Sequence, residues 1–177
     1  MSARIVIVVD MQNGVFTTPR FDRAGRTAAI NQLINAAEHT IFIQHLDADM
    51  QPGNEAWQIL PELYQPPGAH YVNKEACDSF WNTELDELLQ QLNATSFVIC
   101  GCATDYCVDT TIKVGNSKGY AVCVAADAHT TSHRRWATAE QLIDQHNEVW
   151  ANLIMPGNHV QVVSTADIVQ GWRAAAA

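Results

Sequence analysis

The stretch from Ser96 to Thr111, SFVICGCATDYCVDTT, passes from an apolar, β-rich run into a segment with helical character. The run SFVIC is almost continuous in apolar character, which predicts a strand buried on both faces. Residues 105–118 predict a helix, because the segment closes on a Lys-Gly stop signal. Cys107 falls near the first turn of this predicted helix, seven residues past the end of the strand. Its thiol could either pack in the core or react.

The same alternation of β-rich runs and amphipathic segments extends outward along the chain. It predicts an α/β fold with a parallel sheet and helices on both faces. We interpret residues 1–177 as a single domain, with a proline-rich loop and short helix at 47–68. The predicted strands are Arg4–Val9, Thr40–Gln44, Ala69–Val72, Ser96–Cys100, Ala121–Ala125 and His159–Val163. The predicted helices are Arg26–Glu38, Thr83–Leu92, Asp105–Lys118, Arg134–Asn152 and Ser164–Trp172.

The composition is that of an acidic globular protein. Ten Lys and Arg oppose 19 Asp and Glu among 177 residues, a formal net charge of −9. Such a surface argues against nucleic acid or an anionic membrane as a partner. The five cysteines are an odd number, and no apolar run is long enough for a leader or a membrane span. We therefore expect a cytoplasmic protein with free thiols.

Three chemically active residues follow the ends of predicted strands. Asp10 ends the first strand, Lys74 follows the short third strand, and Cys107 follows the fourth. In a parallel sheet the carboxyl ends of strands share one edge, where ligands bind. We therefore expect the three side chains to converge at that edge.

An acid, an ammonium and a thiol together suit acyl transfer. The start of a helix and a lysine both favour the thiolate of Cys107, and Asp10 can accept and return the proton. Backbone N–H groups between Gly101 and Cys107 can hold an oxyanion. Each residue also has a plain alternative: a packed cysteine, a turn-capping aspartate, and a solvated surface lysine at position 74.

Metal chemistry is the main rival. His45, Asp47 and Asp49 follow the second predicted strand in QHLDAD. Two acids and one histidine on a loop are also typical of a solvated turn, and the chain has no CxxC pair. We therefore predict no bound metal.

Five motifs in order resemble the isochorismatase-like cysteine hydrolases over roughly residues 4–170. The motifs are VVDMQNGVF, QHLDADMQPGNEAWQILPEL, NKEACDSFWNTELDELL, VICGCATDYCVDTTIKVGNSKGY and VAADAHTT. The resemblance implies a three-layer α/β/α sandwich with a six-stranded, mostly parallel sheet. It also implies an enzyme without a cofactor, acting on a small-molecule substrate, and a homo-oligomer.

The same resemblance implies roles for individual residues. Cys107 is the expected nucleophile, Asp10 the general base and acid, and Lys74 the neighbouring cation. A non-proline cis peptide is expected at Cys102–Ala103, with the N–H groups of Ala103 and Cys107 forming the oxyanion hole. The expected reaction is hydrolysis of a small amide, ureido or carbamoyl C–N bond through a thioester.

Two alternatives to this function stay open. One is a metal-assisted deamidase of the nicotinamidase type, although the order His45-x-Asp47-x-Asp49 departs from the ligand pattern of nicotinamidases. The other is a non-hydrolytic protein that binds a small molecule or uses Cys107 with Cys102 or Cys100 as a redox pair.

Aromatic side chains near the motifs are candidates for substrate contact. Phe16, Trp81 and Tyr106 could stack on a planar substrate. Packing in the core or at a subunit interface is the alternative for each of them.

Overall fold

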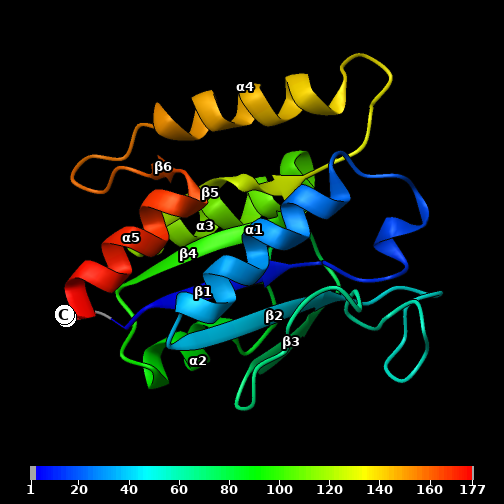
Figure 1. Cartoon of the computed structure of the whole chain (residues 1–177), viewed down its shortest axis with the longest axis horizontal. Helices are drawn as coiled ribbons and strands as arrows, with labels where there is room; N and C mark the ends of the chain where they lie inside the picture. Colours follow the sequence, from blue (N-terminus) through cyan, green and yellow to red (C-terminus); the bar gives the residue numbers. More distant parts are fainter. Residues whose placement is uncertain (1–2, 177) are drawn as a thin grey trace.

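The computed structural model describes residues 3–176, and a six-stranded sheet with all strands parallel forms its centre (Figure 1). The strands are β1 (Ile5–Val9), β2 (His39–His45), β3 (His70–Lys74), β4 (Ser96–Cys102), β5 (Ala121–Thr130) and β6 (Gln161–Val163). Their order across the sheet is β3-β2-β1-β4-β5-β6. The predicted α/β fold is confirmed, and the sheet is entirely rather than mostly parallel.

The strand order changes direction at the pair β1 and β4. From β1 the chain builds outward through β2 and β3, then returns to place β4 on the other side of β1. Connections leaving β1 and β4 therefore diverge, which opens a crevice beyond their carboxyl ends. Asp10 follows β1, and Cys107 follows β4, so both lie at the place where such sheets bind ligands.

Helices cover both faces of the sheet and complete three layers (Figure 1). The helices are α1 (Arg23–Ala36), α2 (Leu85–Gln91), α3 (Asp109–Ser117), α4 (Ala139–Ala151) and α5 (Thr165–Ala176). On one face, α1 and α5 contribute Ile30 and Val169 to an apolar core. On the other, α2, α3 and α4 contribute Leu89, Ile112 and Trp150 to a second core.

Strand β1 shows why its sequence is continuously apolar. All five of its residues are buried. Val6 and Val8 belong to the core under α1 and α5, whereas Ile5, Ile7 and Val9 belong to the opposite core. Alternate side chains thus meet different helix layers, and a polar residue would be costly at either position.

Several predicted boundaries were wrong, among them those of α4 and β5. Helix α4 begins at Ala139 rather than Arg134, because Thr138 caps it and forms a capping box with Gln141. Strand β5 continues past Ala125 to Thr130, and its polar end pairs with the end of β4 after a register shift. Cys107 lies in a π-helical turn, η2 (Thr104–Val108), and not in the first turn of an α-helix.

The segment between β2 and β3 is a long loop that packs against the carboxyl edge of the sheet. Met11 accepts a backbone hydrogen bond from Leu60 (2.9 Å), and Gln12 forms an isolated bridge with Ile59. The predicted short helix is absent from residues 47–68. A short 3₁₀ helix, η1 (Val15–Thr17), follows β1 instead.

A helix needs a long apolar stretch to cross a membrane. Among residues 3–176, none of the helices is both long and apolar enough to cross a membrane.

Candidate active site

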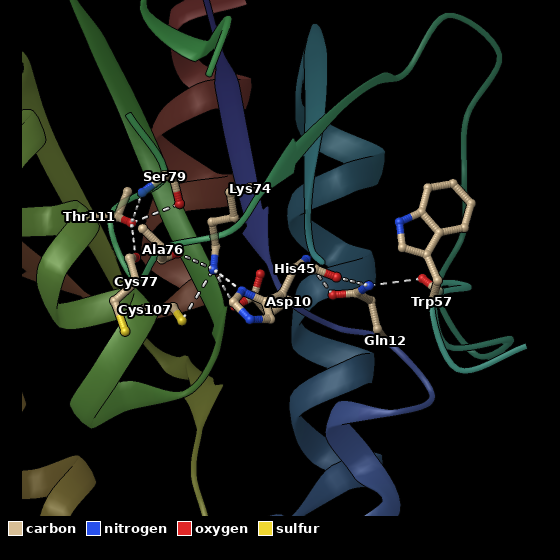
Figure 2. A network of polar contacts seen from close by, with 10 residues as sticks. All are labelled: Asp10, Gln12, His45, Trp57, Lys74, Ala76, Cys77, Ser79, Cys107 and Thr111. Atoms are coloured by element: carbon tan, nitrogen blue, oxygen red, sulfur yellow. Dashed lines mark hydrogen bonds and ion pairs between the residues drawn. The ribbon is translucent and has the colours of Figure 1, made fainter. Parts of the chain in front are cut away.

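The three residues predicted to converge do so at the carboxyl edge of the sheet (Figure 2). Lys74 Nζ lies 2.8 Å from Asp10 Oδ2 and 3.3 Å from Cys107 Sγ. The lysine side chain is completely buried, and that of Asp10 is 4% exposed. A buried ammonium needs a charged partner, and the Asp10 carboxylate provides it.

Asp10 is placed by the backbone directly after β1. Its φ of 49° lies in the left-handed region, which Asp tolerates better than most residues. Its N–H donates to the carbonyl of Ile43 at 3.0 Å, which ties it to β2. Within residues 3–176 its buried Oδ1 makes no hydrogen bond, so this oxygen is available to accept a proton.

Glycine at position 101 allows this close arrangement of β1 and β4. Gly101 has a φ of 114°, and a Cβ at this position would collide with the backbone of Val9. Only glycine therefore lets β4 pass the end of β1 and lead into the turn that carries Cys107.

Lys74 is surrounded by acceptors from four segments of the chain. Besides Asp10 and Cys107, its Nζ contacts the carbonyl oxygen of Ala76 at 2.9 Å and Nδ1 of His45 at 3.2 Å. Burial is the largest single influence and would lower the pKa of Lys74, but the charges of Asp10 and Cys107, together with their hydrogen bonds to the ammonium, outweigh burial and raise the pKa. Lys74 is therefore a permanent cation at this edge of the sheet.

The turn η2 presents Cys107 beside Lys74. The peptide bond between Cys102 and Ala103 is cis, as the family resemblance implied. The carbonyl oxygen of Ala103 accepts backbone N–H groups from Tyr106 and Val108, both at 3.1 Å. These two donors flank Cys107, so the turn is tied back to the residue that follows the cis bond.

The predicted shift in the thiol pKa was wrong in direction. Burial and the negative charge of Asp10 raise the pKa of Cys107, and the ammonium of Lys74 only partly opposes them. Cys107 therefore rests as a neutral thiol, and its proton must leave when it reacts. Sequence reasoning considered the helix and lysine but not the desolvation of the site.

Two residues that the sequence analysis did not assign to the cluster belong to its surroundings. His45 contacts Lys74, and the buried side chain of Gln12 brackets the backbone of His45. Gln12 Oε1 accepts the N–H of His45 at 2.7 Å, and Gln12 Nε2 donates to its carbonyl at 3.1 Å (Figure 2). The only sequence signal was the position of Gln12 two residues after Asp10.

A second polar network lies behind η2. Nδ1 of His129 is 2.8 Å from the hydroxyl of Thr104, and Nε2 is 3.0 Å from Oδ1 of Asn147. Since Nδ2 of Asn147 donates to the carbonyl of Ala126, its Oδ1 accepts from Nε2, and Thr104 donates to Nδ1. Burial lowers the pKa of His129 to about 4. The ring is therefore neutral and fully paired.

Tyr106 lies exposed beside Cys107 and is held from one side. The guanidinium of Arg134 lies 4.8 Å from the centre of the Tyr106 ring. Asp105 fixes Arg134 through two hydrogen bonds, at 2.8 and 3.1 Å. Tyr106 is 53% exposed, so part of its ring is open to solvent.

The other two aromatic candidates lie in different surroundings. Trp81 is 57% exposed and lines a pocket of about 180 Å³ together with Lys74 and Asn82. Phe16 is buried in the core beneath α1, and the guanidinium of Arg23 lies 5.4 Å from its ring centre. Packing, the alternative reading, thus describes Phe16.

The proposed metal ligands do not form a ligand set. Oδ1 of Asp47 accepts the N–H groups of Asp49 and Met50, which is the geometry of a turn. Nδ1 of His45 faces the ammonium of Lys74. In the described part of the chain, residues 3–176, no three His, Cys, Asp or Glu side chains are grouped to hold an ion.

The redox pairs considered from sequence are separated by the sheet. Cys100 and Cys102 are buried in the core beneath α1 and α5, whereas Cys107 packs against the opposite core. Burial raises the pKa of Cys102 to about 12. Cys77 is exposed, and its charge is among those that raise the pKa of Cys107.

Comparison with known proteins identifies the family of this chain. A family model described as the isochorismatase domain matches residues 4–152, and the chain belongs to the isochorismatase family.

The chain is similar to several curated proteins. It is 24% identical over 139 residues to the uncharacterised isochorismatase family protein YddQ of Bacillus subtilis, covering 72% of this chain and 77% of YddQ. It is 28% identical to streptothricin hydrolase of Streptomyces noursei, over 71% of this chain and 49% of the relative. It is 26% identical to ureidoacrylate amidohydrolase RutB of Azorhizobium caulinodans, over 70% of this chain and 74% of the relative. The chain thus spans about half of streptothricin hydrolase.

Solved structures show the same architecture. A cysteine hydrolase from Pseudomonas syringae superimposes with a TM-score of 0.87 at 21% identity, covering 97% of this chain and 93% of the other. An isochorismatase from Pseudomonas putida gives a TM-score of 0.82 at 25% identity, covering 94% and 92%. The predicted three-layer fold is therefore confirmed.

Proposed function

We propose that this protein is a cysteine-dependent hydrolase of a small amide, ureido or carbamoyl C–N bond. The observation that carries the proposal is the buried contact of Lys74 with both Asp10 and Cys107, at 2.8 and 3.3 Å. The names of two relatives, streptothricin hydrolase and ureidoacrylate amidohydrolase, support C–N bond hydrolysis as the reaction class.

The first step is proton transfer from the thiol to the carboxylate. Because the pKa of Cys107 is raised, the thiol keeps its proton until a base takes it. Asp10 has a buried oxygen without a hydrogen bond among residues 3–176, and it accepts this proton. The thiolate then attacks the substrate carbonyl, while Lys74 offsets the negative charge on sulfur.

The second step is collapse of the tetrahedral intermediate. The backbone N–H groups of Ala103 and Cys107 hold the oxyanion, as the family resemblance implies. Protonated Asp10 returns its proton to the departing nitrogen, so that the C–N bond breaks and a thioester to Cys107 remains. Water then hydrolyses the thioester with Asp10 as the base, which restores the free enzyme.

We assign substrate contact to two exposed aromatic side chains, those of Trp81 and Tyr106. Trp81 and Tyr106 are more than half exposed. Trp81 lines a pocket with Lys74, and Tyr106 directly precedes Cys107 in the chain. Planar amides and ureido groups can stack on such rings. Phe16 is buried in the core and is not part of this proposal.

The metal-assisted alternative receives less support. His45 would have to leave Lys74 before its Nδ1 could bind an ion, and Asp47 already accepts two backbone N–H groups. Association into a homo-oligomer stays a prediction from the family resemblance.

Intact-mass spectrometry tests the proposal. The protein is mixed with a panel of primary amides, ureido acids and carbamoyl compounds, with a Cys107→Ala variant as the matched control. We expect a transient adduct whose mass identifies the acyl group, seen only when Cys107 is present. Equal turnover by the Cys107→Ala variant would contradict the mechanism, and loss of turnover with a chelator would favour the metal-assisted alternative.

A further inference from the structure

His45 contacts the cluster without being one of its three predicted members. Its Nδ1 lies 3.2 Å from Nζ of Lys74. An ammonium has three N–H donors and no acceptor, so Nδ1 must be unprotonated and accept this hydrogen bond. The neutral ring then carries its proton on Nε2, and its tautomer is set by Lys74.

The ammonium of Lys74 has more acceptors than protons. Four atoms lie within hydrogen-bond distance: Asp10 Oδ2, Ala76 O, His45 Nδ1 and Cys107 Sγ. Three protons cannot serve all four fully at once. When Cys107 becomes a thioester its sulfur is a poorer acceptor, and the proton directed at it must be shared among the remaining atoms.

The backbone of His45 is held in place by the buried side-chain amide of Gln12. Gln12 is completely buried, and its side chain pairs with both the N–H and the carbonyl of His45. The same amide nitrogen donates to the carbonyl of Trp57 at 3.0 Å. The end of β2 is thereby fixed against the loop that covers it, and the backbone from which the imidazole extends toward Lys74 is held in place.

We propose that His45 is a positioning residue for Lys74. The neutral imidazole accepts one ammonium proton and holds the cation between Asp10 and Cys107 through both acyl-transfer steps. This inference rests on the proposed function, because it concerns the cation that supports the Cys107 thiolate. His45 acts through Lys74 and is not itself a reacting group.

Protonation of His45 would reverse this contact, because an N–H would then face the ammonium. Burial and the charge of Lys74 lower the pKa of His45 below its ordinary value. The carboxylates of Asp10, Asp47 and Glu75 act in the opposite direction. The imidazole is therefore neutral at neutral pH, and acid breaks the contact.

Alkylation of Cys107 by iodoacetamide, followed by peptide mass spectrometry, tests this inference without a known substrate. Rates are measured from about pH 5 to about pH 9, the range in which histidine and thiol groups titrate. All variants carry Cys77→Ser, because Cys77 is exposed and would compete for the reagent. His39→Asn is the matched control, since His39 lies at the opposite end of β2.

Removal of the hydrogen-bond acceptor at His45 should slow the alkylation of Cys107. His45→Ala is expected to alkylate about three- to tenfold more slowly at neutral pH, the effect of one lost hydrogen bond. In His45→Asn, Oδ1 takes the place of Nδ1 but does not titrate. This variant should alkylate at close to the starting rate at neutral pH and lack the acid step that His45 contributes. His39→Asn should leave the profile unchanged.

The outcomes separate this inference from the proposed function. Lys74→Gln that alkylates normally would contradict the role of Lys74 in the proposed function. Slow alkylation in Lys74→Gln, combined with an unchanged His45→Ala profile, would overturn the role of His45 alone. If circular dichroism shows that His45→Ala does not fold, the profile of His45→Asn decides, and a retained acid step overturns the inference.

Discussion

Two buried polar networks lie near the carboxyl edge of the sheet, and they differ in charge and in balance. Around His129 both ring nitrogens are paired, with Thr104 and with Asn147, and the ring is neutral. Around Lys74 the groups are charged, four acceptors share three protons, and one oxygen of Asp10 lacks a hydrogen bond among residues 3–176.

This difference indicates that the network around His129 supports the structure, whereas the network around Lys74 takes part in the chemistry. A buried network with every donor and acceptor paired is rigid and has no reason to change its protonation. An unpaired carboxylate oxygen and a shared ammonium can take up or redirect a proton at little cost. Thr104 begins the turn that carries Cys107, so the neutral network holds the backbone on which the charged one acts.

Replacement of Asp10 should have the largest effect. Asp10→Asn keeps the shape of the side chain but removes the base, and we expect turnover to fall about 10⁴-fold. The rate is measured on whichever substrate the mass-spectrometric panel identifies, with circular dichroism to confirm folding. Turnover within tenfold of the native protein would show that another group accepts the thiol proton.

Loss of the buried cation should be the largest effect on stability. Lys74→Met leaves the carboxylate of Asp10 buried without its partner, and we expect a loss of about 3–5 kcal/mol in the free energy of unfolding. Urea denaturation measures this loss. Addition of Asp10→Asn to Lys74→Met should restore part of it, and a double variant no more stable than Lys74→Met would contradict the pairing.

The neutral network should make the fold sensitive to acid. The pKa of His129 is about 4 in the folded protein against an ordinary value of 6.5, so the unfolded chain binds the proton more tightly. The contribution of neutral His129 to the free energy of unfolding is therefore fully present above pH 6.5. It is lost as the pH drops toward 4, which lowers the free energy of unfolding by on the order of 3 kcal/mol. Urea denaturation at several pH values should show this slope, and His129→Gln should flatten it.

A smaller change tests whether the neutral network acts mainly on stability. Thr104→Val keeps the shape of the side chain and leaves Nδ1 of His129 without its donor. We expect the free energy of unfolding to fall by about 1–2 kcal/mol and turnover to fall only a few-fold. A loss of turnover as large as that of Asp10→Asn would mean that the two networks do not divide their roles.

Substitutions of the exposed aromatic side chains should have the smallest effects on stability and activity. Trp81→Ala and Tyr106→Ala remove rings that are more than half exposed, so stability should change by less than about 0.5 kcal/mol. We expect KM to rise several-fold while kcat changes little, which steady-state kinetics can separate. Unchanged KM in both variants would place the substrate elsewhere.

Asp10, Lys74 and Cys107 could be predicted from sequence because each lies at or beyond the carboxyl end of a strand. The carboxyl ends of parallel strands share an edge, so residues far apart in the chain are brought together by a rule that depends only on order. His45 also follows a predicted strand, so its place at this edge could be predicted, but its contact with Lys74 and the pairing of His129 could not. Their partners, Lys74 and Asn147, are separated from them by 29 and 18 residues and belong to other elements.

The sequence by itself determined the alternation of strands and helices, the identity of the three converging residues and the glycine at position 101. Local periodicity and strand order are properties of the chain, so they can be read without coordinates. Only the tertiary structure decided the direction of the Cys107 pKa, the π-helical turn and the place of His45 beside Lys74. Burial, charge and hydrogen bonding at one point depend on every segment that packs there, and no single stretch of sequence records them.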